Sequence, residues 1–129
     1  ARRLATVAAM TDASTARADL FLLEPGFEDP AFPGTIYFDR YSALLEGVLR
    51  SYPHLETRIV VHRVGFERPR TAVSVLAGAD HQTLPRLVLP VGVDTDQAGS
   101  THGGRRSVAG AGAIIACLVE LYGIAPPHP

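Results

Sequence analysis

Residues that could do chemistry gather in the stretch Asp39-Arg40-Tyr41-Ser42, which follows a long loop rich in proline and aromatic residues. Apolar residues recur after Ser42 at helical spacing, so these residues should occupy the N-terminal turn of a helix. A hydroxyl at that place can stabilise a bound thiolate by hydrogen bonding, and the helix dipole assists. Ser42 is therefore our candidate catalytic residue. The alternative for both Ser42 and Asp39 is that they cap the helix.

The single cysteine, Cys117, limits the sulfur chemistry of the chain. An intramolecular disulfide or a dithiol couple needs two sulfurs, so both are excluded within the chain. Cys117 falls beside Ile114 and Leu118 on the apolar face of a second expected helix, which predicts a buried and inert thiol. Such sparse use of cysteine suits a reducing compartment, and we predict a protein of the cytoplasm.

Composition and charge argue against several other classes of protein. The net charge of −1 does not favour general nucleic-acid binding, which usually needs a basic face. No apolar run approaches the roughly 18 residues that span a bilayer, so no membrane partner is expected. The histidines stand singly, without the spacing of metal ligands, so no metal site is expected.

Apolar runs and turn signals predict the element order β-α-β-α-β-β-α. The strands are expected at residues 20–23, 59–64, 86–91 and 105–109, and the helices at 42–52, 69–77 and 111–122. A helical connection between the first two strands implies a parallel pair. The last two strands, joined without a helix, should be antiparallel. The prediction is one α/β domain over residues 18–129, with a four-stranded mixed sheet and helices on both faces. Residues 1–17 are expected to be disordered or frayed.

Several segments resemble known families. The segment "TLPRLVL", Thr83 to Leu89, is similar to the cis-proline segment of glutathione transferases and glutaredoxins. The segment "AIIACLVELYG" is similar to the last helix of the glutathione-transferase N-terminal domain. Together with "LFLLEPGFEDPAFPG" and "ALLEGVLRSYP", they make the chain from Asp19 onward resemble a small bacterial thioredoxin-like family of unknown function. The resemblance implies a thioredoxin-like fold and a cis peptide bond at Leu84-Pro85.

The same resemblance shows which side chains are replaced. Members of that family often carry two cysteines before the motif Ala-Leu-x-Glu-Gly, and the matching positions here are Asp39 and Ser42. Neither residue can perform thiol–disulfide exchange. Where glutathione transferases carry Glu-Ser before the last helix, this chain has Gly110-Ala111, so the side chains that hold the γ-glutamyl group are missing. The resemblance therefore leaves only backbone groups for ligand binding: the N–H and C=O of Leu84 could pair with a peptide-like ligand.

We therefore predict a non-redox thioredoxin-like domain that acts as a binding or regulatory module for a small thiol, a thiol peptide or a protein segment. The expected groove lies between the start of the first helix and the Leu84-Pro85 turn, with Asp39, Tyr41, Ser42, Leu84 and Pro85 as ligand-binding residues. The sequence identifies no definite cofactor, and the resemblance suggests glutathione as a cofactor or ligand. One alternative is a minimal glutathione-dependent transferase that uses Ser42, as a homodimer. Another is a structural domain that self-associates through a sheet edge or the first helix.

Overall fold

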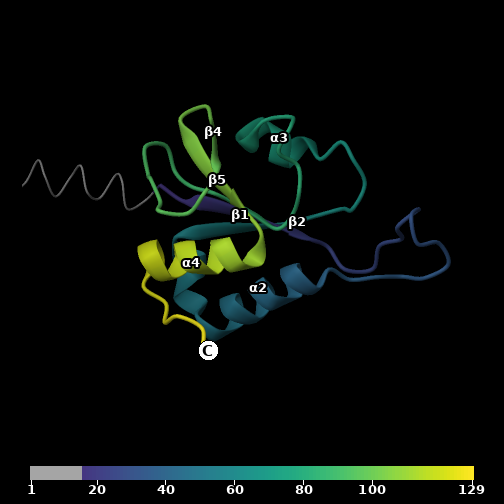
Figure 1. Ribbon diagram of the computed structural model, residues 1–129, viewed down its shortest axis with the longest axis horizontal. Coiled ribbons are helices and arrows are strands. Elements are labelled where there is room, and N and C mark those ends of the chain that lie inside the picture. The colour runs from purple at the N-terminus through teal and green to yellow at the C-terminus, as the bar shows by residue number, and fades with distance from the viewer. Residues whose placement is uncertain (1–15) are drawn as a thin grey trace, which may run out of the picture.

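The structure is a computed structural model that describes residues 16–129 of the chain. The prediction that residues 1–17 are disordered concerns a segment of which residues 1–15 lie outside the described part. From residue 18 onward the chain forms one mixed α/β domain (Figure 1).

A single open sheet of five strands runs through the centre of the domain in the order β2-β1-β3-β5-β4. The strands are β1 (Ala18–Leu23), β2 (Ile59–Val64), β3 (Arg86–Val88), β4 (Ser100–His102) and β5 (Arg105–Ala109). β1 pairs in parallel with β2 and antiparallel with β3, and β5 pairs antiparallel with both β3 and β4. The predicted directions of the first two and the last two expected strands are thereby confirmed.

The prediction of four strands was wrong, because the sheet has a fifth strand, β4, at its edge. Gly103 and Gly104 both adopt positive φ angles, +56° and +76°, and make a two-residue turn between the paired residues His102 and Arg105. Turns of this kind match the right-handed twist of an antiparallel pair and require residues that tolerate positive φ. The pair Gly103-Gly104 is a hairpin signal in the sequence, and the prediction of a four-stranded sheet leaves it out.

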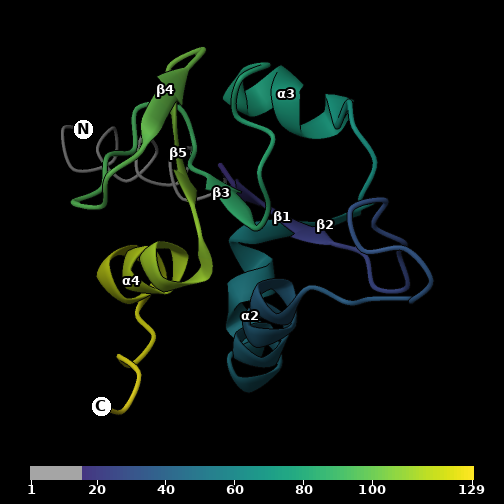
Figure 2. The same ribbon diagram turned by 45° about the vertical axis from the view of Figure 1, so that its right-hand side comes forward.

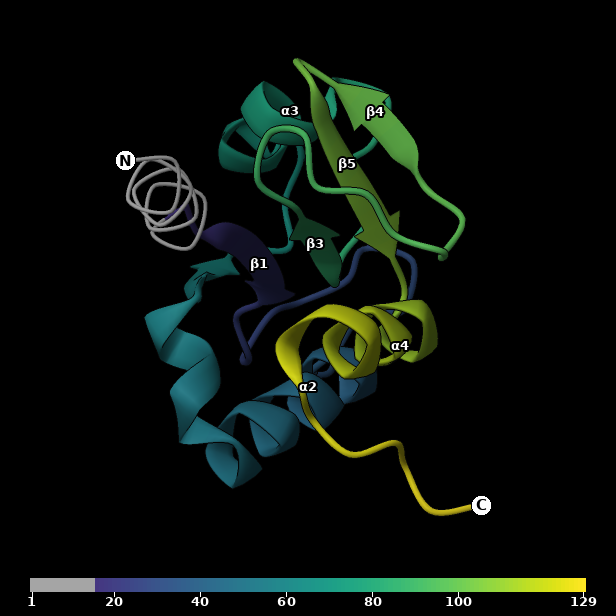
Figure 3. The same ribbon diagram turned by 90° about the vertical axis from the view of Figure 1, so that its left-hand side faces the viewer.

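The helices cover both faces of the sheet, as predicted. α2 (Arg40–Ser51) and α4 (Ala111–Tyr122) pack on one face, and α3 (Thr71–Ala77) lies on the other (Figure 2). Figure 3 shows α2 and α4 beside each other below the strands. A short 3₁₀ helix, Pro53–Thr57, leads from α2 into β2. No helix within residues 16–129 is long and apolar enough to cross a membrane.

β1 is buried on both of its faces, which is why its sequence is almost continuously apolar. Leu20 and Leu22 are fully buried in the larger core cluster, with residues of α2 and α4. Phe21 points to the other side, into a smaller cluster that includes Val73 of α3. Burying each such side chain stabilises the fold by about 1.5–3 kcal/mol.

Two connections meet where the parallel strands end. Residues 24–39 leave the end of β1 and return to the start of α2, closed by a bridge between Phe27 and Tyr37. Residues 65–70 leave the end of β2 and lead into α3. In open α/β sheets, ligands bind outside the carboxyl ends of the strands. This edge of the sheet is therefore the place to look for a site.

The edge strand β4 can be tested with a pair of glycine substitutions. A Cβ atom on Gly99 would overlap the carbonyl oxygen of Ser107 on the paired strand β5, whereas a Cβ on Gly47 of α2 would meet no atom within 4 Å. We expect Gly99→Ala to lower the free energy of unfolding by about 1–3 kcal/mol. Gly47→Ala should raise it by about 0.5–1 kcal/mol, because alanine is the better helix former. Urea unfolding of both variants measures the difference, and a neutral Gly99→Ala would contradict the close β4–β5 pairing.

Candidate functional site

The start of α2 is tied directly to the end of β1 through Ser42. The N–H of Leu23 donates a hydrogen bond to Ser42 Oγ over 3.0 Å. The hydroxyl of Ser42 in turn donates to Oδ2 of Asp39 over 2.7 Å, and the N–H of Ser42 donates to the same oxygen over 2.9 Å. Asp39 is the N-cap of the helix, which is the capping role that the sequence allowed. We call this group of Leu23, Asp39 and Ser42 the Ser42 clasp.

The clasp leaves Ser42 little freedom for another partner. A serine hydroxyl has one hydrogen to donate, and here that hydrogen is directed at the Asp39 carboxylate. The residue is only 2% exposed. A ligand thiolate near Ser42 would have to displace Asp39 as acceptor, beside a group of the same charge. Tyr41, the neighbouring candidate, is 54% exposed on the first turn of α2 and carries no part of the clasp.

The Leu84-Pro85 turn lies beside the same strand end. The peptide bond is cis, as the resemblance implied, and Arg68-Pro69 is a second cis bond that was not predicted. β1 and β3 pair Phe21 with Arg86, and the same register continued by two residues places Leu84 opposite Leu23. Leu23 therefore brings Ser42 and Leu84 to one end of the sheet.

The backbone groups of this turn differ in how they are satisfied. The C=O of Pro85 accepts a hydrogen bond from the N–H of Gly110 over 3.2 Å. The N–H and C=O of Leu84 have no hydrogen-bond partner within residues 16–129, although Leu84 is half-buried against the core cluster that includes Phe21. Half-buried backbone groups usually find partners in native proteins, so Leu84 offers a free donor and acceptor.

Two cavities lie beside the Ser42 clasp, on the side away from Leu84. A cavity of about 200 Å³ is lined by Leu23, Phe38, Asp39 and Ser42, and it adjoins a cavity of about 370 Å³ along residues 27–40. Neither is lined by Leu84 or Pro85. The expected ligand residues thus gather at one strand end, but the concave surface runs along the loop after β1.

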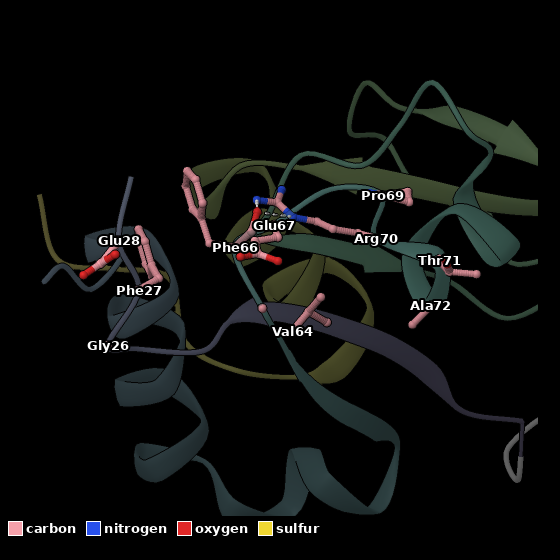
Figure 4. Close-up of a pocket in the computed structure, with 11 residues that line it drawn as sticks. Gly26, Phe27, Glu28, Val64, Phe66, Glu67, Pro69, Arg70, Thr71 and Ala72 are labelled. Carbon is pink, nitrogen blue, oxygen red and sulfur yellow. Dashed lines mark hydrogen bonds between the residues drawn. The ribbon is translucent and has the colours of Figure 1, made fainter. Parts of the chain in front are cut away.

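The largest cavity, of about 650 Å³, opens between the loops that follow β1 and β2 (Figure 4). Phe27 from the first loop stacks on Phe66 from the second, with ring centroids 4.6 Å apart and planes 8° from parallel. The guanidinium of Arg70 lies over the Phe66 ring, 5.6 Å from its centroid. Glu28 and Glu67 also line this cavity. No pattern in the sequence indicates that these two loops meet.

Arg70 is a buried cation that sequence reasoning missed. It is 6% exposed and donates hydrogen bonds to the carbonyl oxygens of Phe66 and Gln82. Within the described residues no carboxylate pairs with it. Burial, and then repulsion from Arg68, lower the pKa of Arg70 below its ordinary value. Its hydrogen bonds fix the chain between β2 and α3 and so shape the large cavity.

A second polar cluster was also missed, on the strands themselves. Asp19 of β1 contacts Nε2 of His62 on β2 at 2.7 Å and accepts from Arg105 of β5 at 2.7 Å. His62 also stacks on Phe21, with ring centroids 4.6 Å apart. The contacts join three strands that are distant in sequence. In the part of the chain from residue 16 onward, no group of three or more His, Cys, Asp or Glu side chains could hold a metal ion.

Cys117 lies in the core, as predicted. Its side chain is fully buried, with Sγ 3.0 Å from the hydroxyl oxygen of Thr95. Burial, the largest effect, raises the pKa of the Cys117 thiol. Thr95 also donates to Glu120 on the next turn of α4, so the contact fastens the loop before β4 onto that helix.

The clasp predicts a specific pattern of stability changes. We expect Ser42→Ala to lower the free energy of unfolding by about 1–3 kcal/mol, because it leaves the N–H of Leu23 without its partner. Asp39→Ala should lower the free energy of unfolding by about 0.5–2 kcal/mol, because the helix loses its N-cap. Ser51→Ala, an exposed serine of the same helix, serves as control and should change stability by less than about 0.5 kcal/mol. Denaturant unfolding measures all three, and equal effects of Ser42→Ala and Ser51→Ala would contradict the clasp.

The burial of Cys117 predicts its reactivity. In the folded protein at pH 8, the thiol should react with a disulfide reagent such as dithiobisnitrobenzoate at least about 100 times more slowly than in denaturant, because attack needs an exposed thiolate. The appearance of thionitrobenzoate by absorbance measures both rates. A folded-state rate equal to the denatured rate would show that the thiol is accessible.

Comparison with protein-family models matches residues 17–126 to a family described as "Protein of unknown function (DUF3088)". A search of curated proteins finds no match, and a search of solved structures finds none either. The family match spans nearly all of the residues that form the sheet and its helices. The chain therefore belongs to the DUF3088 family of proteins of unknown function.

Proposed function

We propose that this chain is a non-redox domain of the thioredoxin-like type, which binds a thiol peptide or an extended protein segment at the carboxyl end of β1. One observation carries the proposal: the N–H and C=O of Leu84 have no partner within residues 16–129, beside a strand end and a capped helix start. An extended peptide can form backbone hydrogen bonds with free N–H and C=O groups of this kind.

The arrangement of the sheet supports the thioredoxin-like part of the proposal. β1 is parallel to β2 and β3 is antiparallel to β5, which agrees with the predicted thioredoxin-like architecture. Two helices on one face and one on the other agree with it as well. The edge strand β4 is an addition to that plan.

The side chains at the start of α2 support binding over redox chemistry. Thiol–disulfide exchange needs an attacking sulfur and a resolving sulfur. The chain has one cysteine, and Cys117 is buried in the core. Asp39 and Ser42, at the positions where the resemblance places cysteines, are engaged with each other and with Leu23. A single buried cysteine also suits a reducing compartment, so we propose the cytoplasm as the setting.

Backbone pairing at Leu84 can be tested by a titration followed through amide resonances. We expect glutathione and short thiol peptides to shift the amides of Leu23, Ser42 and Leu84 in ¹H–¹⁵N spectra. S-methylglutathione is the matched control: equal shifts would assign recognition to the peptide backbone, and larger shifts with the free thiol would assign it to sulfur. A titration that moves no amide near Ser42 or Leu84 would exclude the proposed site.

The transferase alternative makes a different prediction. Since the hydroxyl of Ser42 is directed at Asp39, we expect no conjugation of glutathione to a panel of electrophiles above the uncatalysed rate. Ser42→Ala should give the same rate as the unchanged chain. A rate that depends on Ser42 would replace the binding module with the glutathione-dependent enzyme. Such an enzyme is expected to be a homodimer, so the mass of the protein in solution should also be measured.

A further inference from the structure

The loop after β1 combines negative charge with exposed apolar side chains. Residues 24–39 contain four carboxylates and no arginine. Phe32, Ile36 and Phe38 are 65%, 61% and 66% exposed. Scattered exposed apolar residues are normal on a protein surface, but three large ones on one acidic loop form a local apolar patch. This loop borders the proposed site without being part of the Leu84 turn.

Two of these side chains, Phe32 and Phe38, line the cavity of about 370 Å³. Its lining includes the aromatic residues Phe27, Phe32, Tyr37, Phe38 and Phe66. We call this cavity the aromatic hollow. Two carboxylates, Asp29 and Asp39, line it as well.

Contacts within the loop hold the hollow open in one arrangement. The hydroxyl of Tyr37 donates a hydrogen bond to the C=O of Phe32 over 3.0 Å. The backbones of Phe27 and Tyr37 pair as a β-bridge, with ring centroids 6.4 Å apart. The ring of Phe27 also stacks on Phe66, which belongs to the loop after β2. A preformed aromatic site saves a ligand the entropic cost of ordering it.

The carboxylates of the hollow keep free hydrogen-bonding capacity. Asp29 accepts one hydrogen bond, from the N–H of Ala31 to Oδ1 over 2.9 Å. Asp39 uses only Oδ2, for the clasp. Within residues 16–129, Oδ2 of Asp29 and Oδ1 of Asp39 have no hydrogen-bond partner. The one cation in the lining is Arg40, which is exposed. The balance of charge in the hollow is therefore negative.

We propose that the aromatic hollow binds an arginine side chain of a peptide or protein ligand. The inference rests on the proposed function in that the ligand is a protein segment, and it adds which side chain the segment carries. A guanidinium stacks on aromatic rings and presents several N–H donors to carboxylates. The chain already contains such contacts, since the guanidinium of Arg70 lies over Phe66 and that of Arg58 lies over Tyr122.

Other occupants fit the hollow less well. A neutral apolar side chain would cover the free oxygens of Asp29 and Asp39 without pairing them, which costs free energy. An anionic side chain would meet both carboxylates. The ammonium of lysine is a compact, strongly hydrated charge and stacks less readily on rings than a guanidinium does. Arginine is thus the side chain that uses both the rings and the carboxylates.

Three capped peptides separate these occupants. We would titrate the full chain with acetyl-Gly-Arg-Gly-amide, its lysine analogue and its citrulline analogue, and follow the amides of residues 29–38 in ¹H–¹⁵N spectra. Citrulline has nearly the shape of arginine but no charge. We expect the arginine peptide to bind at least about fivefold more tightly than the citrulline peptide, and more tightly than the lysine peptide. Equal binding of arginine and citrulline, or no shift with any of the three, would overturn the proposal.

Matched variants assign the binding to the hollow. Asp29→Asn keeps an oxygen that can accept from the N–H of Ala31 but removes the negative charge. Phe38→Ala removes an exposed aromatic ring. Each variant should lower the affinity for the arginine peptide by about fivefold. Val75→Ala, at an exposed residue of α3 that does not line the hollow, should leave the affinity unchanged. If Val75→Ala weakens binding as much as Phe38→Ala, the peptide binds elsewhere and the proposal fails.

Two further outcomes are informative. The arginine, lysine and citrulline peptides contain no thiol, and their binding is followed by the amide shifts of residues 29–38. The binding of glutathione is followed by the amide shift of Leu84. Shifts at Leu84 with glutathione but none at residues 29–38 with the arginine peptide would reject the arginine subsite alone. If the amides of residues 29–38 shift on dilution while the arginine peptide leaves them unmoved, a second copy of the chain covers the hollow, and the proposal is overturned.

Discussion

The hydroxyl of Ser42 is the contact on which the geometry of the site depends. It accepts a hydrogen bond from the last residue of β1, Leu23, and donates one to the N-cap of α2, Asp39. One side chain thus satisfies the N–H at the strand terminus and also binds the Asp39 carboxylate that caps the helix. Because both ends of residues 24–39 are fixed in this way, the long loop between them is closed at its base. The aromatic hollow is formed by that loop.

Buried charge in this protein is satisfied mainly by neutral oxygen atoms. Arg70 and Arg86 are 6% and 4% exposed, and both donate to carbonyl or hydroxyl oxygens. Burial lowers the pKa of each. Arg70 fixes the loop before α3, and Arg86 links β3 to β5 through Ser107. Removing either cation would leave acceptors that are at least partly buried without partners, so Arg70 holds the wall of the large cavity and Arg86 holds the strands behind it.

The carboxyl end of β1 therefore combines three features that a binding module needs. It has free backbone groups at Leu84, rigid aromatic rings in the loop after β1, and carboxylates with unused oxygens. It lacks the two sulfurs that redox chemistry requires. The description of the DUF3088 family names no function, so the proposed binding rests on the chemistry of these residues.

Local patterns in the sequence were enough to predict most of the elements. The apolar run of β1, the periodicity of α2 and α4, and the stop at Gly123, which has φ +73° at the end of α4, all act over a few residues. The capping role of Asp39 could be named as an alternative for the same reason. The count of one cysteine alone excluded dithiol chemistry. The hairpin of β4 and β5 was also a local signal, but the glycine pair was not used.

The site itself depended on contacts between residues distant in the sequence. The bond between Ser42 and Leu23, the stack of Phe27 on Phe66, and the network of Asp19 with His62 and Arg105 join segments that no short-range pattern connects. The sequence by itself determined most of the elements that form, and its single cysteine excluded a dithiol couple within the chain. Only the tertiary structure decided which polar groups are used up and which stay free, because that depends on how strands and loops meet in space.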